Sequence, residues 1–123
     1  MDSEKFEQIA QEEFDALPEP FRSRVENVHV VVEETDSGEK RRRARLKPGA
    51  FLLGLYEGVP LVHRGTGYGA YPVLPDRITL FQKNIESVVT SPAEIRAKIR
   101  EVLIHEIAHH FGMSEREIRN AGY

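Results

Sequence analysis

Two histidines four residues apart mark the part of this chain best suited to chemistry. Positions 105–109 read His105-Glu106-Ile107-Ala108-His109, and residues spaced by four project from one face of a helix, about one turn apart. Two imidazole nitrogens placed in this way can bind one divalent metal ion such as zinc. Glu106 lies about 100° around the helix from His105, so it can reach a metal-held water without binding the metal. The spacing therefore predicts a metal site that activates water.

A zinc ion that keeps one position open for water needs a third protein ligand. The chain has no cysteine, so that ligand must be His, Asp or Glu, and the oxygen donors after His109 include Glu115, Glu117 and Asn120. Glu115 completes the pattern HExxHxxGxxE, and Gly112 could reverse the chain and bring it back toward the metal. Glu115 is thus the expected ligand. The alternative is an acid in the first turn of a short terminal helix, where the helix dipole favours negative charge.

The motif lies in a stretch with the start and stop signals of a long helix. Ser91 and Glu94 form a predicted capping box with Pro92 between them, and Gly112 can take the left-handed conformation that ends a helix. We therefore expect a helix over residues 92–111. Its apolar residues face nearly every direction at different heights, which is typical of a central buried helix with a polar site on one side.

Other elements are predicted from hydrophobic period and turn residues. An amphipathic packing helix is expected over residues 3–17 and a valine-rich strand over residues 25–34. Two short strands, 51–56 and 59–63, are expected to form a hairpin around Glu57 and Gly58. A glycine-rich loop is expected at 64–75, followed by a strand over residues 76–82. A further short helix is expected after Ser114, whose side chain and Glu117 offer a second capping box.

Size and composition set limits on the class of protein. The chain has 123 residues, 40% of them apolar and 30% charged, which is consistent with a single globular domain over residues 1–123. With 17 basic and 20 acidic residues the net charge is −3, so the overall charge does not favour binding to nucleic acid. The one basic run, residues 40–47, follows several acids and is expected to be a solvated loop. No stretch approaches a membrane span and the first residues do not resemble a signal peptide, so we expect a cytoplasmic protein.

The motif and three surrounding segments resemble a known group of enzymes. Residues His105, Glu106, His109, Gly112 and Glu115 match the zincin metallopeptidases in the variant where an acid replaces the third histidine. Residues 53–61, 74–81 and 105–112 are similar to the minimal bacterial zincin-like family, and the resemblance covers roughly residues 20–120. Members of that family more often carry Asp at the position of Glu115.

The resemblance implies an α+β, zincin-like fold, in which a small mixed sheet packs on the N-terminal helix and on a central helix carrying the motif. It implies that His105, His109 and Glu115 bind Zn2+. Glu106 would act as general base in the hydrolysis of a peptide or protein substrate. Residues 77–82 are the candidate edge strand for pairing with extended substrate.

Two other functions fit part of the pattern. Single-metal endoribonucleases of ribosomal RNA maturation have similar histidine spacing, but they carry Gly and His where this chain has Glu106 and Glu115. The other alternative is a non-catalytic metal-binding or interaction module, which the small size allows. No oxyanion stabiliser is assigned; the candidates are Tyr56, His63, Arg64, Tyr68 and Tyr71, each expected to be a packing or loop residue. His110 is expected to have a surface or supporting role, and His29 a structural one.

Overall fold

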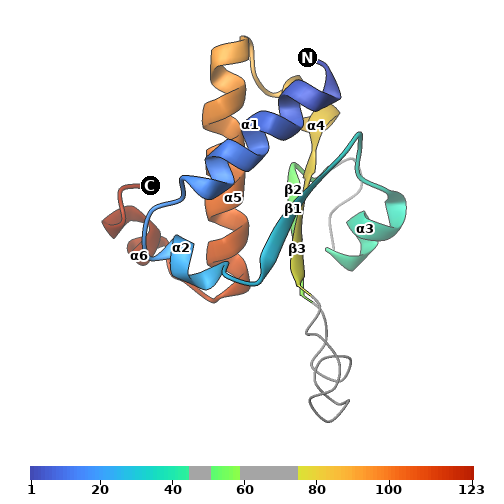
Figure 1. The fold of residues 1–123 in the computed structure, drawn as a ribbon. Helices are drawn as coiled ribbons and strands as arrows, with labels where there is room; N and C mark the ends of the chain where they lie inside the picture. The colour runs from blue at the N-terminus through green and yellow to red at the C-terminus, as the bar shows by residue number, and fades with distance from the viewer. Residues whose placement is uncertain (45–50, 59–74) are drawn as a thin grey trace, which may run out of the picture.

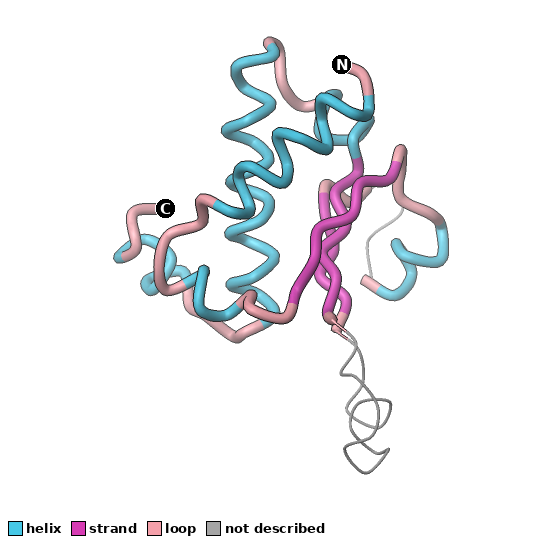
Figure 2. Tube along the Cα trace, viewed as in Figure 1, coloured by secondary structure: helices cyan, strands magenta, loops and turns pink. Residues whose placement is uncertain are grey.

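A three-stranded sheet and six helices make up the part of the chain described by a computed structural model, which comprises residues 1–44, 51–58 and 75–123. Figure 2 shows the two kinds of element along the chain. The strands are β1 (Val28–Glu33), β2 (Gly54–Glu57) and β3 (Asp76–Phe81). The helices are α1 (Ser3–Asp15), α2 (Phe21–Arg24), α3 (Gly38–Arg43), α4 (Gln82–Ser87), α5 (Pro92–His110) and α6 (Glu115–Asn120). The predicted α+β class is confirmed. The predicted strand over residues 59–63 and the loop up to residue 74 lie outside the described residues.

The sheet is mixed, with strand order β1-β3-β2. β1 pairs with β3 in parallel, and β2 pairs with β3 antiparallel. The prediction that residues 77–82 form an edge strand is therefore wrong, because β3 has a partner on each side. Its burial explains the central position: Ile78 to Phe81 are buried on both faces of the sheet. The described edge strand beside α5 is β2.

Helices cover the sheet unequally. α1 and α5 lie together on one face, and α3 lies on the other (Figure 1). Between the first two helices and the sheet is the hydrophobic core, to which α1 contributes Phe6 and Ile9 and β3 contributes Ile78 and Leu80. The packing role predicted for the first helix is thus confirmed. α5 packs against α1, α2, α4 and the sheet, so this helix is central. Its buried residues are Ile95, Ile99, Val102, Leu103, Ile104, Ile107 and Ala108.

The C-terminal end of α5 has the left-handed glycine that the sequence predicts. Gly112 has φ +68°, the left-handed region, and its N–H donates to the His109 carbonyl. The Met113 N–H reaches back to the carbonyl of Ala108 at 2.8 Å. α6 then begins at the predicted capping box of Ser114 and Glu117. At the N-terminal end Ser91 is the N-cap residue, as predicted, but the predicted capping box is wrong. The Ser91 side chain makes no capping hydrogen bond, and the Glu94 carboxylate accepts from the Thr90 N–H and hydroxyl.

The basic run was predicted to be a solvated loop, and its first part is a helix instead. α3 spans Gly38–Arg43 and is capped by the Ser37 hydroxyl, which accepts from the Lys40 N–H. Lys40 forms ion pairs with Glu33 and Glu57 and is only 14% exposed in its side chain. The acids that precede the run therefore pair with it and fold it against the sheet. Residues 45–47 of the run lie outside the described part.

A buried carboxylate ties the start of β2 to two helices. Asp36 accepts from the Leu52 N–H at 3.0 Å, from Arg41 of α3 at 2.8 Å and from the Asn84 amide of α4 at 2.8 Å. Asn84 also donates to the Leu52 carbonyl. Burial by itself would raise the pKa of Asp36, but the hydrogen bonds from Leu52, Asn84 and Arg41 outweigh it and hold that pKa below its usual range. The ionised carboxylate therefore stabilises the fold.

Asp36→Asn is expected to lower the free energy of unfolding at pH 7 and to flatten its fall in acid. Because the folded-state pKa is lowered, Asp36 contributes stability above its unfolded pKa of about 3.9, and that contribution is lost as the pH falls through the folded value. Urea unfolding at several pH values measures both effects. Glu34→Gln, which removes an exposed ion pair with Lys83, is the control. Parallel curves for wild type and Asp36→Asn would contradict the assignment.

None of the helices in the described ranges is both long enough and apolar enough to cross a lipid bilayer.

Candidate active site

The two histidines of the motif lie on one face of α5, as predicted. Their ring centroids are 6.2 Å apart and the rings are nearly perpendicular, at 87°. His105 is half-buried and His109 is exposed. Both belong to the last two turns of the helix, whose buried residues hold it against the core. A rigid, central helix therefore presents a pair of imidazoles toward solvent, and neutral imidazole is a preferred zinc ligand.

Glu106 lies between the two histidines in sequence and is held by the neighbouring strand. The backbone N–H of Tyr56, in β2, donates to the Glu106 carboxylate at 3.1 Å. Burial raises the pKa of Glu106 above its usual range, although the Tyr56 N–H and the two histidines act in the opposite direction. The carboxylate is therefore positioned by a second element of the fold, a contact that spans 50 residues of sequence.

The close approach of β2 to α5 depends on a glycine. A Cβ atom at Gly54 would lie 2.6 Å from the Cγ1 atom of Val102 in α5 and 3.2 Å from the backbone oxygen of Thr79 in β3. Real Cβ contacts are almost never that short, so a larger residue would push the strand, the helix or both apart. Gly54 is thus required for the spacing that lets Tyr56 reach Glu106, and the motif search did not single it out.

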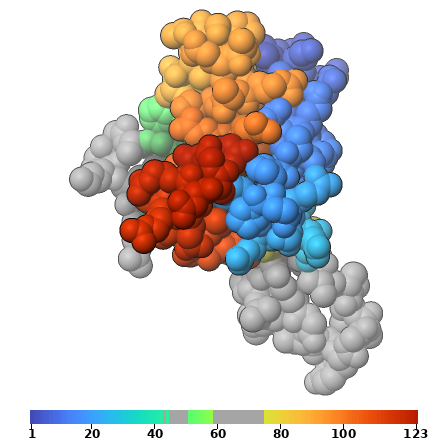
Figure 3. Space-filling model, turned by 90° about the vertical axis from the view of Figure 1, so that its left-hand side faces the viewer, coloured from blue at the N-terminus to red at the C-terminus, as the bar shows by residue number. Residues whose placement is uncertain are grey.

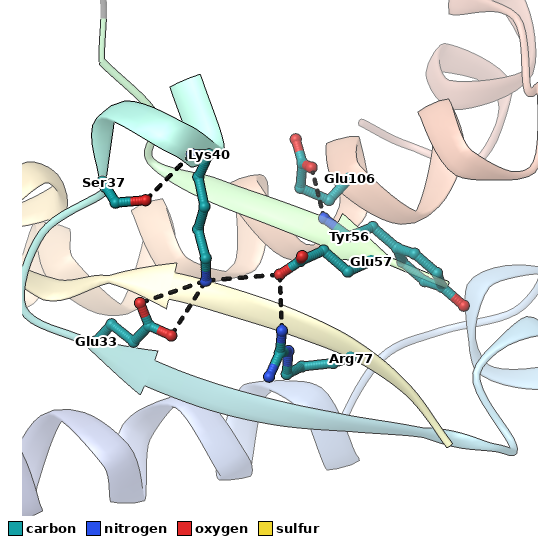
Figure 4. Close-up of polar contacts among 7 residues, drawn as sticks. All are labelled: Glu33, Ser37, Lys40, Tyr56, Glu57, Arg77 and Glu106. Atoms are coloured by element: carbon teal, nitrogen blue, oxygen red, sulfur yellow. Dashed lines mark hydrogen bonds and ion pairs between the residues drawn. The ribbon is translucent and has the colours of Figure 1, made fainter. Parts of the chain in front are cut away.

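Tyr56 is itself fixed on two sides. Its hydroxyl donates to the Asp76 carboxylate at 2.7 Å, and its ring stacks on the His110 ring with centroids 3.8 Å apart and an interplanar angle of 18°. The ring extends away from Glu106 (Figure 4), so the hydroxyl does not serve as an oxyanion stabiliser in this structure. His110, expected to have a surface or supporting role, supports Tyr56. The other candidate stabilisers, at positions 63, 64, 68 and 71, lie outside the described residues.

An ion-pair cluster anchors the end of β2 on the opposite face of the sheet. Its members are Glu33 of β1, Lys40 of α3, Glu57 of β2 and Arg77 of β3. Lys40 is 3.1 Å from Glu33 and 3.5 Å from Glu57, and Arg77 is 3.1 Å from the same Glu57 oxygen (Figure 4). Partly buried pairs that share partners hold their geometry better than isolated surface pairs. The cluster therefore joins α3 and all three strands next to Tyr56.

The structure does not bring the expected third ligand to the histidines. Glu115 is exposed in the first turn of α6. Within residues 1–44, 51–58 and 75–123, no three His, Asp or Glu side chains are arranged to hold a metal ion. Of the other two donors that follow His109, Glu117 takes part in the capping box and Asn120 is exposed at the end of α6. The described site thus combines His105, Glu106 and His109. The donor chemistry of two imidazoles with a nearby acid fits zinc.

A groove of about 500 Å³ runs along α5 and ends at His105. α1 contributes Glu13 to its wall and the C-terminal segment contributes Tyr123. That segment lies against α2 on the surface (Figure 3). The groove provides space for a ligand beside one of the two histidines.

Comparison with known proteins identifies the family and supports the fold. A family model described as zincin-like metallopeptidase matches residues 25–123. Among solved structures, a conserved hypothetical protein from Thermus thermophilus is similar, with 24% sequence identity over 90% of this chain and 94% of that chain and a TM-score of 0.55. That likeness concerns the fold. No curated protein matches the chain. Because the family model covers the sheet, α5 and the whole of the motif, the chain belongs to the zincin-like metallopeptidase family.

Proposed function

We propose that this protein is a zinc-dependent peptidase that hydrolyses peptide bonds, with Glu106 as general base. The observation that carries the proposal is the position of Glu106: its carboxylate is held by the Tyr56 N–H beside a pair of imidazoles on the same helix. A base oriented by a backbone donor, beside two imidazoles that can bind a metal, supplies groups that metal-assisted hydrolysis uses. Membership in the zincin-like family supports the same reaction class.

His105 and His109 would hold the zinc ion, with Glu115 as the third ligand. When bound, zinc would lower the pKa of water and polarise the peptide carbonyl. Glu115 is exposed and lies three residues beyond Gly112, whose left-handed backbone sets the direction in which the chain leaves α5. We propose that this carboxylate joins the two histidines when the metal binds.

Glu106 would take a proton from the attacking water and return it to the leaving amine. The carboxylate accepts one hydrogen bond from Tyr56 through Oε1, which fixes its orientation on the helix. General base catalysis by a positioned side chain contributes typically 10²- to 10⁴-fold to a rate. In this proposal Glu106 transfers the proton, and the two histidines bind the metal ion.

A peptide or protein substrate would pair in extended form with β2 through outward backbone groups other than the Tyr56 N–H, which Glu106 occupies. This strand replaces residues 77–82 as the candidate, because it forms an edge of the described sheet and lies against α5. Main-chain hydrogen bonds to a sheet edge recognise an extended backbone independently of its sequence. The proposal therefore predicts affinity for extended peptides.

An RNA substrate is disfavoured by the partners of the basic run. Lys40 is paired with Glu33 and Glu57, and Arg41 is paired with Asp36. These cations already have carboxylate partners, so binding phosphates would first require breaking those pairs. The two alternatives, an endoribonuclease and a non-catalytic metal-binding module, become outcomes of the same experiment.

The proposal predicts one zinc ion per chain and zinc-dependent cleavage of peptides. Purified protein is loaded with zinc, dialysed and examined by elemental analysis, and then incubated with a peptide library and a structured RNA. We expect cleaved peptides and intact RNA, and no cleavage after removal of zinc by a chelator.

His109→Ala should abolish the stoichiometric zinc, Glu115→Gln should weaken its binding, and His29→Ala should leave it unchanged, because His29 lies on β1 away from the motif. Cleavage of RNA alone would favour the endoribonuclease. Bound zinc without cleavage of either substrate would indicate the non-catalytic module.

A further inference from the structure

We propose that Tyr56 is a positioning residue for Glu106. Its backbone N–H orients the carboxylate, and its side chain is clamped by Asp76 and His110 so that the N–H stays in place. The inference rests on the proposed function for its effect on catalysis, but the contact itself can be tested without any activity. It assigns a role in orienting the general base to a residue outside the histidine motif.

The Tyr56 N–H points away from the sheet. Phe81 donates to the Leu53 carbonyl at 3.0 Å, so residues 53, 55 and 57 form the hydrogen-bonded pairs with β3. By the alternation of an antiparallel ladder, the backbone groups of Gly54 and Tyr56 face outward. Within the described sheet, an outward N–H of this strand takes no part in the ladder with β3. Here the donor meets a carboxylate, and such charge-assisted bonds are stronger than those between neutral groups.

The side chain of Tyr56 is clamped at both its ring and its hydroxyl. The residue is only 9% exposed. The hydroxyl is 2.7 Å from Asp76, which begins β3, and the ring stacks at 3.8 Å on His110, which ends α5. A bond to a charged partner in a buried place resists displacement more than a solvated one. The clamp therefore fixes Tyr56 relative to both the central strand and the helix.

One residue of β2 thus contacts α5 at two points one helical turn apart. Glu106 accepts from its backbone, and His110, four residues later, covers its ring. β2 has only four residues, so its ladder with β3 is short and the contacts of Tyr56 add to it. Displacement of a catalytic group by about 1 Å can cost about 10²-fold in rate. The clamp is therefore expected to affect kcat more than KM.

The contact between Tyr56 and Glu106 is tested by amide hydrogen exchange followed by NMR. In wild type the Tyr56 amide should exchange slowly. Glu106→Ala should speed its exchange at least several-fold, and Glu106→Gln should protect it better than the alanine variant, because the glutamine side chain retains an oxygen acceptor. The Leu55 amide, which belongs to the ladder with β3, reports on folding and should change little in either variant. Unchanged exchange of Tyr56 in Glu106→Ala would overturn the proposal.

The effect on catalysis is tested on the zinc-loaded protein with a peptide it cleaves. Replacing the Tyr56 amide by an ester, through incorporation of the α-hydroxy analogue of tyrosine, removes the N–H while keeping the side chain and should lower kcat about 10²-fold with KM within about twofold. Tyr56→Phe, which loses the hydroxyl and its bond to Asp76 but keeps the ring and the backbone N–H, should lower kcat less.

His110→Ala should lower kcat, and His110→Phe should restore much of it, because an aromatic ring again covers Tyr56. Zinc content should be unchanged in the ester and in Tyr56→Phe. Equal kcat in wild type and the ester would overturn the positioning role. If wild type cleaves no peptide at all, the proposed function fails, and the exchange experiment still decides the contact.

Discussion

Glu106→Gln is expected to lower kcat for peptide hydrolysis by about 10²- to 10⁴-fold, the usual contribution of a general base. Glutamine has nearly the same shape as glutamate, and its side-chain oxygen can still accept from the Tyr56 N–H. It cannot, however, take a proton from water. The substitution therefore separates proton transfer from the geometry of the site.

Steady-state kinetics on one peptide taken from the library digest, together with zinc content, measures this effect. Zinc stoichiometry and the free energy of unfolding should stay close to those of wild type, because neither histidine is altered. Glu7→Gln, a change of an exposed carboxylate on α1, is the matched control and should keep full activity. A Glu106→Gln protein that cleaves as fast as wild type would remove Glu106 from the mechanism.

Gly54→Ala is expected to lower the free energy of unfolding by about 1–3 kcal/mol, the range seen when a well-packed core is overfilled. The added Cβ would lie 2.6 Å from Val102 and 3.2 Å from the carbonyl oxygen of Thr79. Val102 is buried and the Thr79 oxygen belongs to the backbone of the central strand, so neither can yield at little cost. Urea unfolding gives the change directly.

A double-mutant cycle identifies the cause. In a Val102→Ala background the atom that would collide is gone, so Gly54→Ala should cost less there, and the remaining cost should reflect the approach to the Thr79 oxygen. Gly38→Ala is the control: its Cβ would meet only the end of the Arg42 side chain at 3.4 Å, and it begins a helix. A neutral or stabilising effect of up to about 1 kcal/mol is expected for it. An equal cost of Gly54→Ala in both backgrounds would exclude the collision with Val102.

The elements with a strong local signal were predicted well from sequence. α5 has start signals at its N-terminus and a glycine after its C-terminus, so its limits could be predicted. Side chains at i and i+4 of a helix project from one face, so the common face of His105 and His109 followed from their spacing alone. α1 has a clear helical period, and β1 is a run of β-branched valines that ends at a turn. The order of the strands has no such local signal. β3 was expected at an edge because it precedes α5 in the sequence. It pairs with both β1 and β2, and its residues are buried on both faces, as is typical of a central strand.

Much of the site depends on contacts between distant residues, which no spacing rule reveals. The bond from Tyr56 to Glu106 uses a backbone N–H, and any residue type at position 56 other than proline has one. Gly54 matters because of what lies opposite it, and Lys40 because its acidic partners come from two different strands. Glu115 illustrates the reverse case: its spacing predicts a ligand, and the described structure leaves it apart from the histidines. Its role as a ligand stays a prediction.

The bond between the Tyr56 N–H and Glu106 also bears on how the molecule behaves among copies of itself. Exposed edge strands can recruit strands from other chains and seed aggregation, and folded proteins shield them with charge, short length or a covering element. β2 combines all three, since it has four residues, lies against α5 and has the outward N–H of Tyr56 occupied by a carboxylate. The residue proposed to perform the chemistry therefore also makes pairing of a neighbouring molecule's strand less favourable at this position, because such a strand would have to do without the Tyr56 N–H.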